Sequence, residues 1–119
     1  MSATAAELSR KHCVPCEGGV PALSPAEVQG HLAALPSWKL TADGKRIRRE
    51  WRVKDFTTAL DFFNRVGQVA EQEDHHPDLH VTGYRNVAIE MWTHAVGGLT
   101  QNDFILAAKI DTLPVALKV

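Results

Sequence analysis

The chain has 119 residues, of which 45% are hydrophobic and 23% are charged. That length fits one domain with its own core. The charges nearly balance, with 13 Lys and Arg against 14 Asp and Glu, which gives no bulk electrostatic reason to expect nucleic acid as a partner.

The apolar runs, the N-terminal sequence and the cysteine count indicate the cellular compartment. No apolar run reaches the roughly 18 residues of a membrane-spanning helix, and the N-terminus lacks the apolar core of a secretory signal. Two cysteines, Cys13 and Cys16, are too few for a disulfide framework. We therefore expect a reducing, cytoplasmic location. Prolines and glycines predict a flexible leader over residues 1–22, followed by a single domain over residues 23–119.

The first part of the predicted domain contains a helix and a hairpin. Ser24–Glu27 predicts a helix start, with a capping box and proline at the first helical position, and Pro36 ends the helix. Trp38–Leu40 and Ile47–Val53 predict two strands joined at Asp43-Gly44. Alternate residues of the second strand share one face, Ile47, Arg49, Trp51 and Val53, while Arg48, Glu50 and Arg52 take the other.

The strongest helical pattern begins at Asp55, an N-cap candidate, and continues to about residue 73. Its apolar stripe consists of Phe56, Ala59, Leu60, Phe63, Val66 and Ala70. Leu79–Val81 and Val87–Met91 then predict two short strands. A capping box at Thr100–Asp103 opens a last helix, which runs through Ile110.

The order α-β-β-α-β-β-α predicts an α+β fold. Sequential hairpins with helices between them favour a four-stranded antiparallel sheet with the helices on one face.

Histidines give the first indication of chemistry, since four of the six lie between residues 75 and 94. His75 and His76 end the long helix, and His94 follows a strand, so these side chains can converge on one cleft. Because histidine titrates near neutral pH, a pair can hold one proton donor and one acceptor, as loss of water requires. No serine lies near enough to favour covalent catalysis.

Other interpretations of these residues remain open on spacing alone. Isolated histidines such as His12 and His31 are more often surface or capping residues. His80 lies in an alternating strand and is expected to face water. Asp103 is also explained as the third position of a capping box, which needs a hydrogen-bond acceptor.

The segment Glu71–Pro77, followed by Tyr84, His94 and Asp103, resembles the signature of the pterin-4a-carbinolamine dehydratases. That pattern is an acidic residue, three positions, His-His-Pro, a short gap, an aromatic residue, nine positions, His, eight positions and Asp. Nine residues separate Tyr84 from His94, and eight separate His94 from Asp103. Six residues follow Pro77 before Tyr84, one more than in the family pattern, and the glycine among them predicts a lengthened turn or bulge.

The resemblance implies a hydro-lyase, 4a-hydroxytetrahydrobiopterin dehydratase. Such an enzyme removes the C4a hydroxyl and the N5 proton as water, gives quinonoid dihydropterin, and recycles the cofactor of aromatic amino-acid hydroxylases. It implies three catalytic histidines, His75, His76 and His94. It also implies pterin contacts at Glu71, Asp74, Trp92, Thr93, Ala95 and Asp103.

The resemblance extends to partners and roles. Asp103 is expected to orient His94 or to cap its helix. The pterin is the substrate, and no metal or organic cofactor is implied. We expect a homodimer or homotetramer that binds neither nucleic acid nor a membrane.

Two other function classes compete with this prediction. A small zinc-binding protein would use Cys13 and Cys16 with the histidines, but a single CxxC is weak support. An interaction module is the second, since animal members of the family also act as dimerisation cofactors for a transcription factor. Such binding would use a helix face and would not need the histidine set, and the apolar stripe over residues 56–70 is more often core or subunit contact than a partner site.

Overall fold

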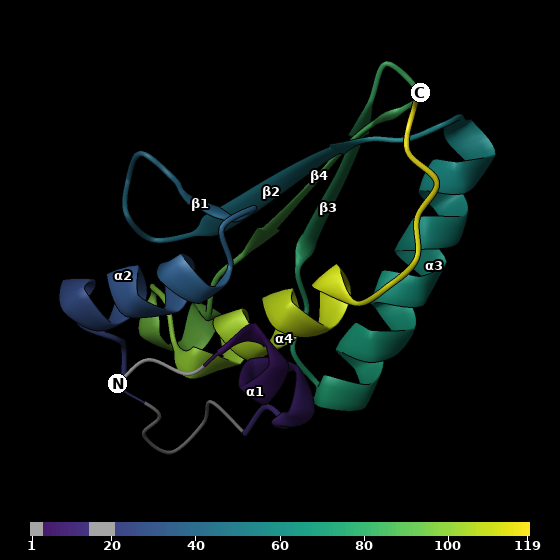
Figure 1. Cartoon of the computed structure of the whole chain (residues 1–119). Coiled ribbons are helices and arrows are strands. Elements are labelled where there is room, and N and C mark those ends of the chain that lie inside the picture. The colour runs from purple at the N-terminus through teal and green to yellow at the C-terminus, as the bar shows by residue number, and fades with distance from the viewer. Residues whose placement is uncertain (1–3, 15–20) are drawn as a thin grey trace.

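The structure, a computed structural model, describes residues 4–14 and 21–119 and contains one antiparallel sheet with strand order β1-β2-β4-β3. Its elements are α1 Ala5–Arg10, α2 Pro25–Ala34, β1 Lys39–Leu40, β2 Ile47–Arg52, α3 Phe56–Glu73, β3 Asp78–Thr82, β4 Asn86–Met91, the 3₁₀ turn η1 His94–Val96 and α4 Gln101–Asp111. Figure 1 shows the helices gathered on one side of the sheet. The predicted α+β class, with a four-stranded antiparallel sheet and helices on one face, is confirmed.

Helix starts follow the capping residues that the sequence predicts. Ser24 Oγ accepts the backbone N–H of Glu27, and the Glu27 carboxylate accepts the backbone N–H of Ser24. Asp55 accepts the backbone N–H of Thr58 at the start of α3. These bonds satisfy N–H groups that the first helical turn leaves without a partner, and so fix where each helix begins.

The inner face of the sheet forms the core. Ile47 of β2 lies opposite Met91 of β4, and Trp51 lies opposite Val87, and all four are buried. Trp51 also contacts the ring of Phe62 on α3, edge to face. Of the four residues predicted to share a face, Ile47, Trp51 and Val53 are buried, and Arg49 is partly buried.

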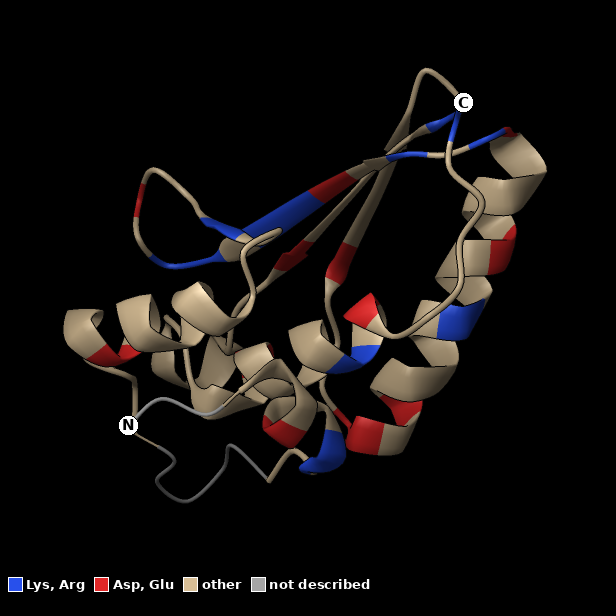
Figure 2. Ribbon diagram, in the orientation of Figure 1, with Lys and Arg blue, Asp and Glu red and all other residues tan. Residues whose placement is uncertain are grey.

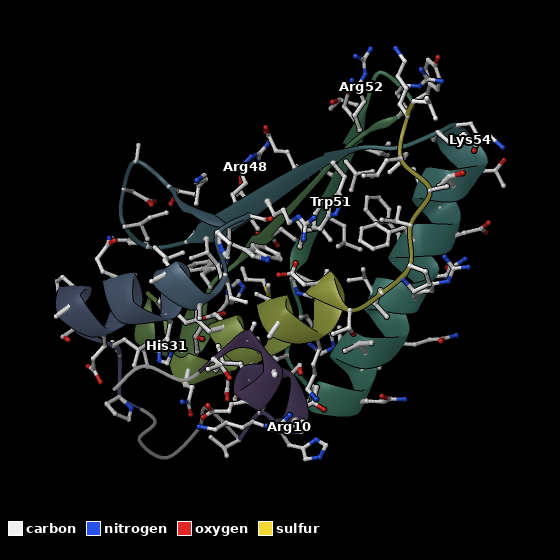
Figure 3. The ribbon with its side chains drawn as sticks, in the orientation of Figure 1. Arg10, His31, Arg48, Trp51, Arg52 and Lys54 are labelled. Atoms are coloured by element: carbon white, nitrogen blue, oxygen red, sulfur yellow. The ribbon has the colours of Figure 1, made fainter. Side chains whose placement is uncertain are left out.

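The outer face of the sheet is charged. Arg48 of β2 forms ion pairs with Glu50 and with Glu90 of β4. Figure 2 shows blue and red segments of ribbon along the strands. Figure 3 shows Arg48 and Arg52 on the side away from the helices, whereas Trp51 points toward α3. His80 lines a hollow on this outer face, as expected for a water-facing histidine.

The buried side of α3 differs from the predicted stripe. Ala59, Phe62, Val66 and Ala70 are buried, whereas two members of the predicted stripe, Phe56 and Leu60, are 48% and 44% exposed. The buried residues are spaced by three and four and define one side of the helix, and the exposed pair lies on a neighbouring side. Because both sides of α3 are apolar, periodicity alone did not identify the one that meets the sheet.

The N-terminal part of the chain also differs from expectation. Within the predicted flexible leader, Ala5–Arg10 form α1, whose Leu8 is fully buried and which packs on α4. Residues 1–3 and 15–20, which include Cys16, lie outside the described residues. The division at residue 22 stays a prediction. No helix in the two described stretches is long and apolar enough to cross a membrane.

The two sides of α3 give a prediction about stability. Phe62→Ala is expected to lower the free energy of unfolding by about 3–5 kcal/mol, because it removes a fully buried ring. Phe56→Ala, on the same helix but half exposed, should cost less than about 1.5 kcal/mol. Urea unfolding of both variants checks this, and equal losses would contradict the packing of α3 described above.

Candidate active site

His75 and Asp103 form a buried pair at the junction of α3 and α4. His75 follows the C-cap of α3 and is 7% exposed, and Asp103 lies in the first turn of α4 and is 0% exposed. His75 Nε2 lies 2.7 Å from Asp103 Oδ1. The sequence left two roles open for Asp103, orienting His94 or capping its helix. The capping role is confirmed, and the other carboxylate oxygen bonds to His75.

The Asp103 carboxylate is saturated by donors. Its second oxygen accepts the hydroxyl of Thr93 at 2.8 Å and the backbone N–H of Thr100 at 3.0 Å. A carboxylate only accepts hydrogen bonds, so the proton between Asp103 and His75 lies on His75 Nε2. The bond to Asp103 thus engages Nε2 of the ring and not Nδ1.

His76 points away from His75. The backbone of Asp74, directly before the pair, is left-handed with φ of +50°, a conformation that aspartate tolerates better than most residues. His75 turns into the protein, whereas the exposed side chain of His76 bonds through Nε2 to Glu71 Oε2 at 2.6 Å. Two adjacent histidines therefore each have one nitrogen on a carboxylate of their own.

His94 lies at the start of η1, directly after Thr93, whose hydroxyl bonds to Asp103. Its ring packs against the indole of Trp92, with 4.1 Å between centroids. The bond from Thr93 to Asp103 ties the end of β4 to the His75 pair. His94 and His75 are thus held at the same end of the sheet.

Arg46, which sequence reasoning missed, joins both sides of this region. Its guanidinium lies 4.6 Å from the centroid of the Trp92 ring and pairs with Glu90 and with Asp78, two residues beyond His76. Arg46 precedes β2 in the loop after β1, and no motif spacing connects it with the histidines. The only signal in the sequence was the short basic run in which Arg46 lies, Lys45–Arg49.

The predicted pterin contacts do not all lie on the surface. Glu71, Asp74 and Ala95 are exposed, and Trp92 is half-buried. The side chains of Thr93 and Asp103 are buried and bonded to each other. Pterin contact at these two residues stays a prediction.

Tyr84 of the signature lies far from the histidines. It occupies the loop after β3, where Gly83 and Tyr84 both have left-handed backbones, with φ of +52° and +56°. Five residues of β3 separate this loop from the His-His-Pro segment, a distance of about 17 Å at 3.3 Å per residue. Residues 83–85 form the turn between β3 and β4, and that this turn is lengthened relative to the family pattern stays a prediction.

Titratable side chains in the described ranges form no group of three or more His, Cys, Asp or Glu arranged to hold a metal ion. Two histidine–carboxylate pairs and a third histidine can instead hold and exchange protons. Such an arrangement suits general acid–base chemistry on a bound molecule.

Asp103→Asn is expected to lower the free energy of unfolding by about 1–3 kcal/mol. An amide NH₂ would face one of the three donors that now share the carboxylate. Asp61→Asn, at an exposed position of α3, serves as the matched control and should have little effect. Urea unfolding measures both, and an Asp103→Asn protein as stable as the wild type would contradict the bonding described here.

Comparison with known proteins identifies the family. A family model described as pterin 4 alpha carbinolamine dehydratase matches residues 21–113. The mitochondrial pterin-4-alpha-carbinolamine dehydratase 2 of Arabidopsis thaliana is 53% identical over 113 residues, which cover 92% of this chain and 60% of that protein. A putative pterin-4-alpha-carbinolamine dehydratase of Rubrobacter xylanophilus is 46% identical over 107 residues, which cover 90% of this chain and 98% of that protein.

A solved structure agrees with the sequence comparisons. The crystal structure of a transcriptional coactivator/pterin dehydratase from Brucella melitensis superposes with a TM-score of 0.72 at 32% identity, covering 76% of this chain and 96% of that one. The chain spans about three fifths of the length of the Arabidopsis relative and nearly all of the Rubrobacter one. It belongs to the pterin 4 alpha carbinolamine dehydratase family.

Proposed function

We propose that this chain is a hydro-lyase that removes water from a 4a-hydroxytetrahydropterin to give the quinonoid dihydropterin. The observation that carries the proposal is the match to the dehydratase family over residues 21–113, a range that contains His75, His76 and His94. The physiological role proposed with it is recycling of the tetrahydrobiopterin cofactor of aromatic amino-acid hydroxylases.

The reaction requires two proton transfers on one face or edge of the pterin. The bond from C4a to the hydroxyl oxygen breaks, and a proton delivered to that oxygen lets it leave as water. The proton on N5 is lost, and its electron pair forms the new double bond to C4a. One donor and one acceptor are therefore needed at the same moment, which a set of histidines supplies.

The contacts of the histidines support these roles. His75 and His76 each hold one ring nitrogen on a carboxylate, which fixes the ring and leaves Nδ1 for proton exchange. His94 is exposed beside Trp92, at the same end of the sheet. We propose that these three histidines exchange the two protons as a coupled set.

Charge and stacking groups surround the histidines. As the hydroxyl leaves, positive charge spreads into the pterin ring, and the exposed carboxylates of Glu71 and Asp74 would stabilise it. Trp92 and Ala95 are proposed to contact the pterin, with Thr93 and Asp103 as the buried support. No metal enters this mechanism.

Other functions are less well supported. The Brucella structure bears the words transcriptional coactivator in its title, and a partner of that kind would use an apolar surface such as exposed Phe56 and Leu60. The family match includes the complete histidine set, which a binding module would not need. A zinc-binding protein is distinguished by metal analysis of the purified chain, where near-stoichiometric zinc would favour it.

We further propose that the chain is a homodimer or homotetramer. β3 is an edge strand of the sheet, and exposed edges invite pairing with a second copy. Leu79 on that strand and Phe56 and Leu60 on α3 are exposed apolar side chains. Their burial between copies would remove this apolar surface from water.

A cytoplasmic location remains part of the proposal, on the basis of the two cysteines and the N-terminal composition. The Arabidopsis relative is named as mitochondrial, so the relatives do not share one stated compartment.

The catalytic proposal predicts the effect of removing single histidines. A stopped-flow assay would generate 4a-hydroxytetrahydropterin and follow its dehydration by absorbance. His76→Ala and His94→Ala are each expected to lower the catalysed rate by about 10²–10⁴-fold, the usual contribution of a general acid or base. His80→Ala, in the same stretch but on the outer face, should keep the wild-type rate. A wild-type protein that fails to exceed the uncatalysed rate would overturn the proposal.

The oligomer proposal predicts that a double substitution, Phe56→Ser with Leu60→Ser, shifts the protein to a smaller species in light scattering after size-exclusion chromatography. A single Asp61→Ser substitution on the same helix is the control and should leave the mass unchanged. A wild-type mass of one chain at micromolar concentration would contradict the oligomer.

A further inference from the structure

Residues 4–14, here called the N-terminal strap, lie beside the junction that His75 and Asp103 hold together. Leu8 of the strap is fully buried, and α1 packs on α4. Lys109 of α4 donates its Nζ to the backbone oxygen of Ser9 at 2.9 Å. The strap is therefore packed on the helix that carries Asp103.

Asn102 attaches the end of the strap to the first turn of α4. Its side chain is buried, its Oδ1 accepts the backbone N–H of Val14 at 3.0 Å, and its Nδ2 donates to the Val14 carbonyl at 2.7 Å. The Asn102 amide thus both accepts from and donates to the backbone of Val14, as the backbone of a neighbouring β-strand would. Asn102 directly precedes Asp103 in a rigid helical turn.

Glu73 attaches the strap to the end of α3. Its side chain is 6% exposed, and it accepts the backbone N–H of Cys13 at 2.7 Å and bonds to His12 Nδ1 at 3.0 Å. Burial raises the pKa of this carboxyl, but the bonds from Cys13 and His12 and the charge of Lys109 lower it further, so the net pKa lies below its usual value. Glu73 is thus held as a carboxylate, two residues before His75.

We propose that Glu73 and Asn102 are positioning residues, which use the strap as a second bridge across the α3–α4 junction to hold His75 against Asp103. The inner bridge is the bond from His75 to Asp103. The outer bridge runs from Glu73 through residues 12–14 to Asn102. Both bridges join the same two helix ends, so loosening the outer one lets the inner pair separate.

The short distance along the chain makes this coupling direct. Only Asp74 separates Glu73 from His75, and no residue separates Asn102 from Asp103. Displacing a group in a reactive arrangement by about 1 Å can cost roughly 10²-fold in rate. The kinetic consequence rests on the dehydratase function proposed above, whereas the geometric consequence does not.

The first measurement uses the full-length protein and the dehydration assay. Asn102→Ala and Glu73→Ala are expected to lower kcat by roughly tenfold to 10²-fold, with KM changed by less than about twofold, because orientation is lost and ground-state binding is not. Their pH profile of kcat should also change. Glu73→Gln keeps an acceptor for the Cys13 N–H and should recover most of the rate. Arg10→Ala, which removes an exposed strap side chain (Figure 3), is the matched control.

The second measurement needs no activity. In protein with ¹⁵N-labelled histidine, the proton bonded between His75 Nε2 and Asp103 should give a protected downfield NMR signal, assigned by its loss in Asp103→Asn. This signal is expected to weaken or shift in Asn102→Ala and Glu73→Ala, and to persist in Arg10→Ala and Glu73→Gln.

Together, the two measurements distinguish failure of the positioning role from failure of the dehydratase proposal. An unchanged signal in Asn102→Ala and Glu73→Ala overturns the positioning role, whether or not the wild type is active. A changed signal with an inactive wild type supports the positioning role and removes the dehydratase proposal. A changed signal with unaltered kcat overturns the claim that positioning matters for the reaction, as does a kcat that falls only with the folded fraction.

Discussion

The arrangement of the rest of the site depends on the buried carboxylate of Asp103. An ionised group with no exposure is costly unless it is fully hydrogen-bonded, and here three donors from three segments supply the bonds: His75, Thr93 and the backbone of Thr100. The end of α3, the end of β4 and the start of α4 must therefore meet at one point. This junction places the histidines at one end of the sheet, where they form the candidate site.

Arg46 and the charged side chains of the sheet also help to shape the site. Arg46 reaches from the loop before β2 to Glu90, to Asp78 and to the face of Trp92. Its cation is shared between two carboxylates and an aromatic ring, a combination that a planar guanidinium satisfies well. The half-buried indole beside His94 is thereby supported by the hairpin at the other edge of the sheet, and β1 and β2 take part in shaping the site.

Sequence reasoning succeeded where the signal was local. Capping boxes, strand alternation and histidines at the ends of elements depend on residues a few positions apart, and the structure has the predicted helices and strands where these patterns placed them. It failed where the deciding contact was remote. Phe62 faces the sheet and Phe56 is exposed, because packing against the sheet decides which of the two apolar sides of α3 is buried. The same holds for α1, whose six residues are too short to be stable alone and depend on burial of Leu8 against α4.

The choice of partner for Asp103 shows the same limit within the site. His94 lies nine positions before Asp103 and His75 lies 28 positions before it, and the histidine that bonds to Asp103 is the more distant one. The left-handed turn at Asp74 decides the outcome, because it sends His75 inward and His76 outward. Nothing in residue spacing encodes that reversal. The pairing of the signature's residues is seen only in the three-dimensional structure.

The hairpin between β3 and β4 separates two ends of the molecule that differ in how well they tolerate insertions. Its loop, with Gly83 and Tyr84, extends into solvent at the end of the strands away from the histidines. Loops in such places absorb insertions at little cost in free energy, because neither the core nor the strand register has to move. The additional residue between Pro77 and Tyr84 can thus be accommodated as a change in loop length, while the strands continue to deliver both histidine-bearing segments to the same place.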